Sequence, residues 1–587
     1  MTGAPGEPCG GFDYARQAMM RPFALVLATV FAGACAQPSP EPPADLVLTG
    51  GVIRTFDTAR TRAEAVAIRQ GRIIAVGTDA SVRPFIGPAT RTVDLAGRLV
   101  LPAFHDVHVH PMSAGVELGQ CNLNDLASAA ATLDAIRQCA ASNAGKPWLI
   151  GGGWLLTTFP PGQPRRQDLD GITGSVPAVF SSSDGHTVWV NSAALTAAGI
   201  TRATLDPPAG RIERDARGEP TGLLREAATD LVTRVVPATT TDEYQAGLVR
   251  ALARLNAVGI VSFEEASARE PMVAAYRAVA REGRLTARAH LSLYADPALD
   301  ASQVDRFVAT RTSVREPGLS ATAVKIFVDG VIEAGTAAVL DPYIPLAGDA
   351  GVRPHGLPNF SDEALTALVT RLDREGFQTH MHAIGDAGVR QGLDAIAAAA
   401  RVNGPRDRRP HIAHIQLIHP ADVPRFTSIG VVANMQPLWA SRDRFITELT
   451  EPRLGPERSR WLYPFRALQQ AGARLAGGSD WSVSSVNPLD AIEVAVTRKD
   501  VGAPDDAPAW LPEHRLDLDT AVAAYTNGGA FVSFEDDSGS LAAGKLGDLV
   551  VLDRNIFERP AREIHEARVL WTLLEGREVY RADNFRP

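Results

Sequence analysis

Three of the thirteen histidines of the chain lie within six residues, at His105, His108 and His110 in LPAFHDVHVHP. In a β-strand, residues two apart point to the same side, so His108 and His110 can present two imidazoles to one metal ion. A His-x-His pair alone is weak support, because such pairs are also common in cores and on surfaces. Other candidate strands end in further ligand types, at His382, His414 and Asp480. Neutral imidazoles together with a carboxylate suit Zn²⁺ or a similar divalent ion.

Lys325 lies in the apolar stretch AVKIFVDG, where a free ammonium would lose several kcal/mol of solvation. A salt bridge to Asp329 or Glu333 would offset that cost. Alternatively, CO₂ carbamylates Lys325 and makes it an anionic ligand able to bridge two cations. The residues alone leave both interpretations open.

Further polar residues beside the strand ends are candidates for substrate contact. Glu264 in SFEEAS and Glu333 could line a pocket, while Gln436, Trp439 and Trp481 could either shape it or serve packing. A further candidate, His186 in SDGHT, could reach the substrate or stabilise its own loop. His380 shares a strand face with His382, and we expect it to support a ligand rather than bind the metal.

The segments that must position these residues alternate between short apolar strands and Ala/Leu-rich helical stretches, such as residues 362–375 and 464–471. The candidate strands are LPAFHDVHVH, GIVSFEEAS, ARAHLSLYAD, TAVKIFVDG, FQTHMHAIGD, HIAHIQLI, GVVANMQP and RLAGGSD. Such βα units indicate a parallel sheet. The eight strands predict an α/β fold, a (β/α)₈ TIM-like barrel with its site at the C-terminal strand ends.

Both ends of the chain contain Gly-punctuated β-rich runs, such as DLVLTGGVIRTFD and GKLGDLVVLDRN. They predict one small β-sandwich built from residues 44–100 and 531–587, with the barrel over residues 101–530. The segment at about 115–224 is too long for a βα connection. We expect it to be an insertion over the barrel mouth.

The N-terminus has the pattern of an export signal. A short apolar run in MRPFALVLATVFAGACAQPSPEPP precedes small residues and Cys35, and it is too short to span a bilayer. Residues 1–36 are therefore interpreted as a lipoprotein leader and 37–43 as a Pro-rich tether, with Cys35 as the lipidated residue. Ordinary export with cleavage near Ala34 remains the alternative. Either way we expect an exported protein, periplasmic or anchored to the outer membrane.

Two cysteines remain in the mature chain, Cys121 and Cys139. In an exported protein they are expected to form a disulfide, the alternative being two buried thiols. The 58 basic and 67 acidic residues are interspersed. Neither nucleic acid nor an anionic membrane surface is therefore implied as a partner, and membrane contact is expected only through the lipid anchor.

As a set, LPAFHDVHVHP, AVKIFVDG, HMHAIGD, HIAHIQ and AGGSDW occur in this order. With them the chain resembles the amidohydrolase superfamily, in its N-substituted formamide deformylase-like branch of the amidohydrolase 3 type. The resemblance runs from about residue 45 to 580 and includes SSSDGHTVWVNSAAL and GSLAAGKLGDLVVLD. Two stretches depart from the family: SFEEAS has Glu264-Glu265 where relatives often have His-Asp, and VDGVIEAGT differs from a Gly/Ser-rich loop.

The resemblance implies a binuclear centre. His108, His110 and Asp480 would hold the buried metal, His382 and His414 the more exposed one, and carboxylated Lys325 would bridge them. The ions would be two Zn²⁺, with Mn or Fe as alternatives.

The implied reaction is hydrolysis of C–N bonds other than peptide bonds, in an amide, N-formyl or cyclic amide, by a metal-activated hydroxide. Asp480 would shuttle the proton, and His382 and His414 would assist catalysis at the exposed metal. One alternative is hydrolysis of an ester, lactone or phosphoester at the same centre. Another is a lipoprotein that binds a metal or ligand without turnover, against which the complete ligand set argues. We expect a small-molecule substrate, and a homodimer is compatible with the sequence.

Overall fold

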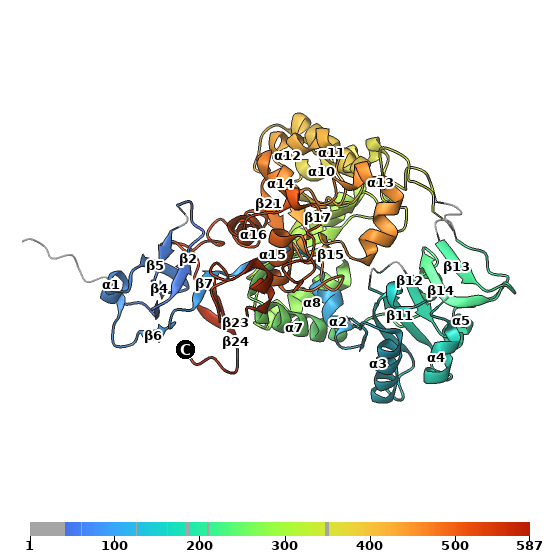
Figure 1. Ribbon diagram of the computed structural model, residues 1–587, viewed down its shortest axis with the longest axis horizontal. Helices are drawn as coiled ribbons and strands as arrows, with labels where there is room; N and C mark the ends of the chain where they lie inside the picture. The colour runs from blue at the N-terminus through green and yellow to red at the C-terminus, as the bar shows by residue number, and fades with distance from the viewer. Residues whose placement is uncertain are drawn as a thin grey trace, which may run out of the picture. The chain divides into compact units, whose positions relative to one another are not determined.

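Eight parallel strands form the centre of the fold in the computed structural model (Figure 1). The structure describes residues 42–59, 61–124, 126–160, 163–183, 185, 187–207, 210–346 and 352–587. The predicted leader, Cys35 and His186 lie outside these residues, as does most of the predicted tether. The (β/α)₈ barrel predicted from the sequence is confirmed.

The barrel strands follow one another in the sheet in the order in which they occur in the chain. They are β8 (Phe104–Val109), β15 (Ile260–Ala268), β16 (Arg288–Tyr294), β17 (Leu319–Phe327), β18 (Gln378–Ala383), β19 (His411–His414), β20 (Val432–Met435) and β21 (Leu475–Gly477). The first and last strands approach each other where the Asp480 N–H donates to the His108 carbonyl at 2.7 Å. This contact brings the ends of β8 and β21 together at the predicted site.

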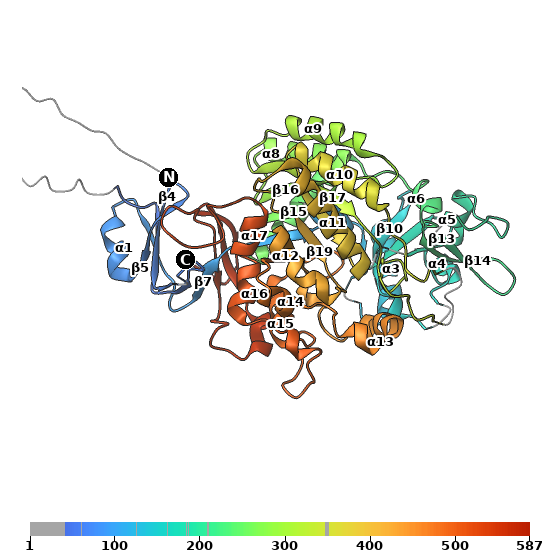
Figure 2. The ribbon, with the colours of Figure 1, turned by 90° about the horizontal axis from the view of Figure 1, so that it is seen from above.

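Helices pack against this sheet, and Figure 2 shows α8 to α12 beside β15, β16, β17 and β19. The helices of this part are α2 (Pro111–Glu117), α7 (Thr241–Ala257), α8 (Glu270–Arg281), α9 (Val304–Ser313), α10 (Asp362–Arg374), α11 (Asp386–Asn403), α12 (Val423–Ile429), α13 (Glu451–Ser459), α14 (Phe465–Gln470), α15 (Pro488–Thr497), α16 (Leu518–Ala524) and α17 (Asn527–Val532). Helix α10 begins at a Ser361 cap, whose hydroxyl accepts from the Ala364 N–H. The helices predicted at 362–375 and 464–471 correspond to α10 and α14.

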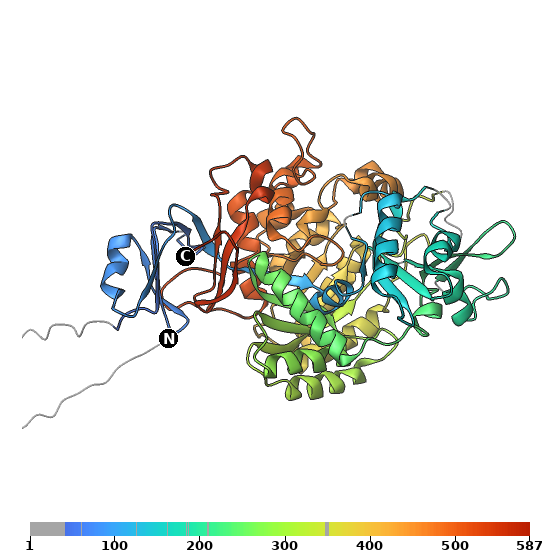
Figure 3. The same ribbon diagram turned by 90° about the horizontal axis from the view of Figure 1, so that it is seen from below.

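Two further sheets are formed by the chain ends, one by N-terminal strands alone and the other by strands from both ends. One contains β1 (Leu46–Thr49), β4 (Ala65–Arg69), β5 (Arg72–Gly77) and β6 (Arg91–Asp94), with α1 (Asp79–Val82) beside it. The other contains β2 (Val52–Arg54), β3 (Arg62–Ala63), β7 (Leu99–Pro102), β22 (Leu549–Leu552), β23 (Val569–Leu574) and β24 (Arg577–Arg581). Leu48 and Trp571 share one apolar core between them, and Figure 3 shows the C-terminal end beside the first strands. The predicted sandwich of both chain ends is confirmed.

The inserted segment forms a six-stranded sheet of its own. It contains β9 (Cys121–Asn122), β10 (Leu149–Trp154), β11 (Ala178–Ser182), β12 (Thr187–Val190), β13 (Gly210–Arg214) and β14 (Pro220–Glu226), with helices α3 (Ala129–Ser142), α4 (Arg166–Thr173), α5 (Ser192–Ala197) and α6 (Asp230–Thr233). As predicted, Cys121 and Cys139 are joined in a disulfide, which ties β9 to α3. Leu155 and Ser183 of the insertion line the cavity at the barrel mouth. In the part of the chain that the structure describes, no helix has the length and apolar character to cross a membrane.

Candidate metal centre

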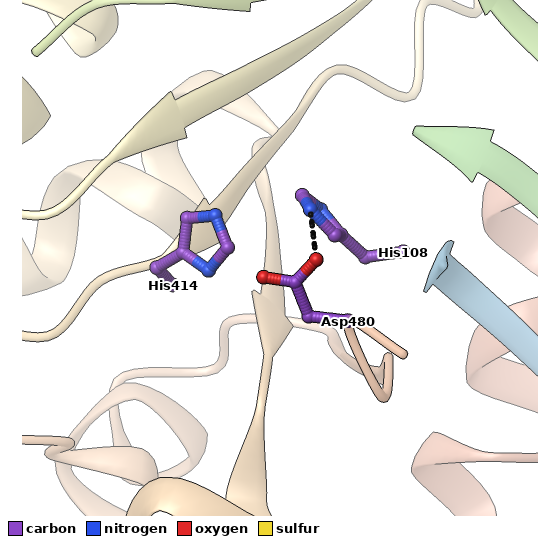
Figure 4. Close-up of side chains that lie close together, drawn as sticks. All are labelled: His108, His414 and Asp480. Carbon is purple, nitrogen blue, oxygen red and sulfur yellow. Dashed lines mark ion pairs between the residues drawn. The ribbon is translucent and has the colours of Figure 1, made fainter. Parts of the chain in front are cut away.

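Three buried side chains from different barrel strands converge at the C-terminal strand ends (Figure 4). His108 comes from β8, His414 from the end of β19, and Asp480 from the turn after β21. Their ligand atoms all lie within 4.8 Å of one another. His108 Nε2 is 3.5 Å from Asp480 Oδ1.

The other three predicted ligands surround this group. His110 Nε2 lies 3.1 Å from Asp480 Oδ1, and Lys325 Nζ lies 3.1 Å from His108 Nε2. The ring of His382 is 4.5 Å from that of His414, centroid to centroid. All six predicted ligands line one cavity of about 480 Å³. The structure therefore brings together every residue of the predicted ligand set.

Two atoms of this group show that the donor set fits a metal ion. His414 Nδ1 and Asp480 Oδ1 are buried and have no hydrogen-bond partner among the described residues. A buried polar atom without a partner costs about 1–3 kcal/mol. A divalent cation would use both lone pairs, and imidazole and carboxylate are ligands of zinc-like ions.

The electrostatics of the site favour the protonation states that metal binding needs. Burial alone would raise the pKa of Asp480, but His110, His414 and Lys325 hold it at about 2. Burial lowers the pKa of His108 and His414 well below the usual value. The carboxylate is therefore ionised and these two imidazoles are neutral at neutral pH, as ligands must be.

The two basic groups beside them shift in opposite directions. Burial lowers the pKa of Lys325 to about 7, although Asp480 and nearby glutamates oppose this shift. Burial also acts to lower the pKa of His110, but Asp480 and Glu265 raise it to about 9. In the metal-free protein His110 is thus an imidazolium at neutral pH, while Lys325 is partly a neutral amine.

The salt-bridge interpretation of Lys325 is wrong. Asp329 accepts hydrogen bonds from backbone N–H groups of neighbouring loops instead. Glu333 accepts from Gln416 Nε2 at 2.9 Å. Among the described residues, neither carboxylate forms an ion pair with Lys325, whose nearest polar contact is His108.

Of the predicted substrate contacts, Glu333 lines the cavity and Glu264 does not. Glu264 is 1% exposed and lies deeper in the barrel, with its Oε1 atom 3.1 Å from His380 Nδ1. Burial disfavours its charged form, but His411 and His380 hold the pKa of Glu264 well below its usual range. The assignment of Glu264 as a substrate contact is therefore corrected to a buried partner of histidines.

Gln436 and Trp481 also differ from the predicted substrate contacts, because neither lines the cavity. Gln436 is 1% exposed, and its Oε1 accepts from the His414 N–H at 2.9 Å. The Trp481 carbonyl accepts from the His110 N–H at 2.9 Å. The Gln436 side chain thus holds the backbone of His414, and the Trp481 backbone holds that of His110. A substrate contact of the Trp481 side chain stays a prediction. Trp439 does line the cavity, stacked on the His414 ring at 5.3 Å.

Sequence reasoning missed several residues of the cavity wall. Gln416 lines it, and its position two residues after His414 is a signal that could have found it. Asp443 and Phe445 come from a long excursion between β20 and α14. Connections that are longer than a βα loop requires are often functional. The length of this connection could therefore have indicated that it contributes to the cavity.

Comparison with known proteins identifies the family. The model of the amidohydrolase family matches residues 91–580. The chain belongs to the amidohydrolase family. Protein LONG AFTER FAR-RED 3 of Arabidopsis thaliana is 32% identical over 92% of each chain. The N-substituted formamide deformylase of Arthrobacter pascens is 28% identical over 91% of this chain and 97% of its own.

The fold of this amidohydrolase has a solved counterpart. A crystal structure of an uncharacterized metal-dependent hydrolase from Pyrococcus furiosus aligns with a TM-score of 0.69 and 24% identity, over 87% of this chain and 99% of that one. The family resemblance predicted from the motifs is confirmed. The protein is a metal-dependent hydrolase of this family, and its candidate metal-binding residues are those at the strand ends.

Proposed function

We propose that this amidohydrolase hydrolyses C–N bonds other than peptide bonds in small molecules such as amides, N-formyl amines or cyclic amides. The observation that carries the proposal is that all six predicted ligands line one cavity of about 480 Å³, where two buried atoms, His414 Nδ1 and Asp480 Oδ1, form no hydrogen bond with the described residues. The similarity to an N-substituted formamide deformylase supports a C–N bond as the target.

The metal centre we propose holds two Zn²⁺ ions. His108, His110 and Asp480 would bind one, His382 and His414 the other, and a CO₂-derived carbamate on Lys325 would bridge them. The lowered pKa of Lys325, about 7 because of burial, supports the carbamate, since CO₂ reacts with the neutral amine. When bound, such ions lower the pKa of water and polarise a carbonyl oxygen.

Asp480 is the residue we propose to move the proton. It is ionised, with a pKa held at about 2, and its Oδ1 atom has no hydrogen-bond partner among the described residues. Its place at the cavity, beside the predicted metal ligands, would let it accept a proton from the attacking water and pass it to the leaving nitrogen. His414, which is stacked on Trp439, and His382 would flank the reacting carbonyl.

The cavity wall favours neutral or cationic substrates over anionic ones. Phe327, Trp439 and Phe445 give it large apolar surfaces, and Glu333 and Asp443 add negative charge. Lys325 is the one Lys or Arg among its described lining residues, and it belongs to the metal centre. A substrate carboxylate that lies away from the metal centre, beside Glu333 or Asp443, would thus meet repulsion without a matching Lys or Arg.

A substrate panel tests the function. Metal-loaded enzyme is assayed with N-formyl amines, cyclic amides, N-acyl amino acids, lactones and phosphotriesters, and the Asp480→Asn variant is the matched control. We expect turnover of neutral C–N substrates and a loss of about 10²–10⁴-fold in the variant. Turnover restricted to lactones or phosphotriesters would instead establish the ester-cleaving alternative.

We also propose that the protein is exported and anchored through Cys35, as a periplasmic or outer-membrane lipoprotein. Support comes from the short apolar run, the small residues before Cys35 and the prolines after it. Mass spectrometry of the mature N-terminus should find a lipidated Cys35. An unmodified terminus beginning at Ala36 or Gln37 would contradict the anchor.

A further inference from the structure

Two consecutive glutamates of β15, Glu264 and Glu265, lie beside the metal centre without lining its cavity. Their side chains are 1% and 0% exposed. Among the described residues, their ion-pair partners are all histidines and include neither Lys nor Arg. Two buried carboxylates with such partners need a reason, because an unmatched buried charge is costly.

The hydrogen bonds of Glu264 set the position of protons on two imidazoles. An ionised carboxylate only accepts, so the 3.1 Å contact from His380 Nδ1 to Glu264 Oε1 places a proton on Nδ1. His380 Nε2 is then a bare acceptor, and His108 Nδ1 lies 2.8 Å from it and donates. The remaining nitrogen, His108 Nε2, is left with a lone pair facing Asp480.

On the other side of Glu264, a chain of side-chain amides determines which nitrogen of His411 carries the proton. The His414 N–H donates to Gln436 Oε1, and Gln436 Nε2 donates to Asn434 Oδ1 at 3.1 Å. Asn434 therefore presents its NH₂ group to His411 Nδ1 at 3.0 Å. The proton of His411 must sit on Nε2, which faces Glu264 Oε2 at 3.4 Å. Both oxygens of Glu264 thus face N–H groups.

Glu265 contacts the second histidine of the β8 pair directly. Tyr276 donates its hydroxyl to Glu265 Oε2 at 2.9 Å, and the Met112 N–H donates to the same oxygen at 3.2 Å. Glu265 Oε1 forms no hydrogen bond with the described residues and lies 3.6 Å from His110 Nδ1, within the distance of an ion pair. A proton attracted to Nδ1 leaves His110 Nε2 facing Asp480.

We propose that Glu264 and Glu265 are positioning residues of the metal centre. Each places the proton of one ligand imidazole on Nδ1, Glu265 directly on His110 and Glu264 through His380 on His108. Both Nε2 lone pairs are thereby directed to the metal. The inference rests on the proposed metal binding, and groups that orient ligand histidines typically change metal affinity by about 10–100-fold.

The test is the metal affinity of Glu264→Gln and Glu265→Gln. Glutamine keeps the volume, but its amide cannot accept from both His380 and His411. Zn²⁺ affinity is measured on metal-stripped protein by competition with a chromogenic chelator, at alkaline pH where His110 is neutral. We expect affinity to fall by about 10–100-fold and the visible spectrum of the Co²⁺ form to change. Tyr276→Phe, which removes one donor to Glu265, should act in the same direction more weakly.

Glu535→Gln is the matched control. Glu535 is also a buried glutamate bonded to a serine and a histidine, Ser262 and His290, but it lies away from the ligands. The Glu535→Gln substitution should lower the thermal stability of the metal-free protein and leave Zn²⁺ affinity and the Co²⁺ spectrum unchanged.

Two results would overturn the inference. One is unchanged Zn²⁺ affinity and an unchanged Co²⁺ spectrum in a folded Glu264→Gln variant. The other is a third zinc ion in the wild type that this variant loses, since Glu264, His380 and His411 would then themselves hold a metal. A wild type that binds no divalent ion would contradict the proposed function instead, so the two failures are distinguishable.

Discussion

Glu264 and Glu535 are buried at different depths of the same barrel and have similar partners. Glu264 accepts from Ser292 and His380 in the barrel interior, beside the predicted metal ligands. Glu535 accepts from Ser262 at 2.6 Å and contacts His290 at 2.6 Å, near the N-terminal strand ends. The two clusters therefore use the same three residue types.

The difference between them is a guanidinium. Arg288 donates to Glu535 at 2.7 Å and to Asp548 at 2.6 Å, which neutralises the buried charge at the N-terminal end. The described residues provide no such cation at Glu264, so its charge acts on the imidazoles around it. In barrels of this type the N-terminal face serves stability and the C-terminal face chemistry. Here the cluster of Glu, Ser and His serves stability where an arginine is present, and we infer that it serves the metal centre where none is.

The largest effect separating the two ends is expected at Lys325. Lys325→Ala should lose metal and activity together, because it removes the proposed bridging ligand, and a short carboxylic acid at high concentration should restore part of both. Lys325→Arg should not substitute, since a guanidinium keeps its charge and repels cations. Elemental analysis and rate measurements check this. Full metal content in either variant would exclude the bridging role.

At the opposite end, Arg288→Ala should act on stability alone. It leaves Glu535 and Asp548 as unmatched buried charges, and breaking a buried pair costs about 3–5 kcal/mol. Denaturant unfolding of the metal-free protein measures the loss. The metal affinity of the folded fraction should equal that of the wild type, and a weakened metal site would show that the two ends are coupled.

The insertion offers a third region for the comparison. Replacing Cys121 and Cys139 by serine should destabilise by about 3 kcal/mol on the chain-entropy model, given their separation of 18 residues. Metal affinity should not change, because the disulfide ties β9 to α3 and touches no predicted ligand. Urea unfolding of oxidised wild type and double variant gives the difference. Equal urea midpoints for the two proteins would show that the disulfide does not stabilise the fold.

The smallest expected effect is a pH dependence confined to the C-terminal end. Asp480 and Glu265 raise the pKa of His110 to about 9, and its imidazolium must release a proton before it can bind a metal. Below that pKa a proton on His110 competes with the metal. Zn²⁺ affinity should therefore rise up to about tenfold per pH unit from neutrality and become constant above the pKa. Chelator competition across this range checks the slope. Zn²⁺ affinity of the Glu535→Gln variant should change with pH in the same way as that of the wild type. An affinity that does not depend on pH would contradict the assignment of His110 as a ligand that must lose a proton.

Much of the barrel and the ligand set could be predicted because strand order and polar strand ends are local signals. Once eight strands close, parallel topology alone brings His108, His414 and Asp480 to one end. The side on which Glu264 lies could not be predicted, because β15 has irregular register with β8 between Phe263 and Glu265. A bulge interrupts the two-residue alternation from which strand faces are inferred.

The insertion sheet was missed for a different reason. Strand β9 has two residues and β12 four, and their pairing joins segments separated by helices. Such short strands carry little periodicity, and their partners supply the stability. The role of Gln436 could not be predicted, because a tertiary hydrogen bond, which has no sequence signature, turns its side chain toward the backbone of His414.

The junction between β7 and β8 has a consequence for how the chain is made. A single residue, Ala103, separates β7 from β8, the strand that carries His108 and that His110 directly follows. Strand β7 pairs with β22, which lies close to the C-terminal end of the chain. Its other partner, β2, is synthesised early, but a ribosome must translate almost the whole chain before β7 can pair with β22. This second pairing therefore belongs to the late, slow, non-local steps of folding. Premature termination before β22 would leave every predicted ligand in the polypeptide and the first two without their anchor.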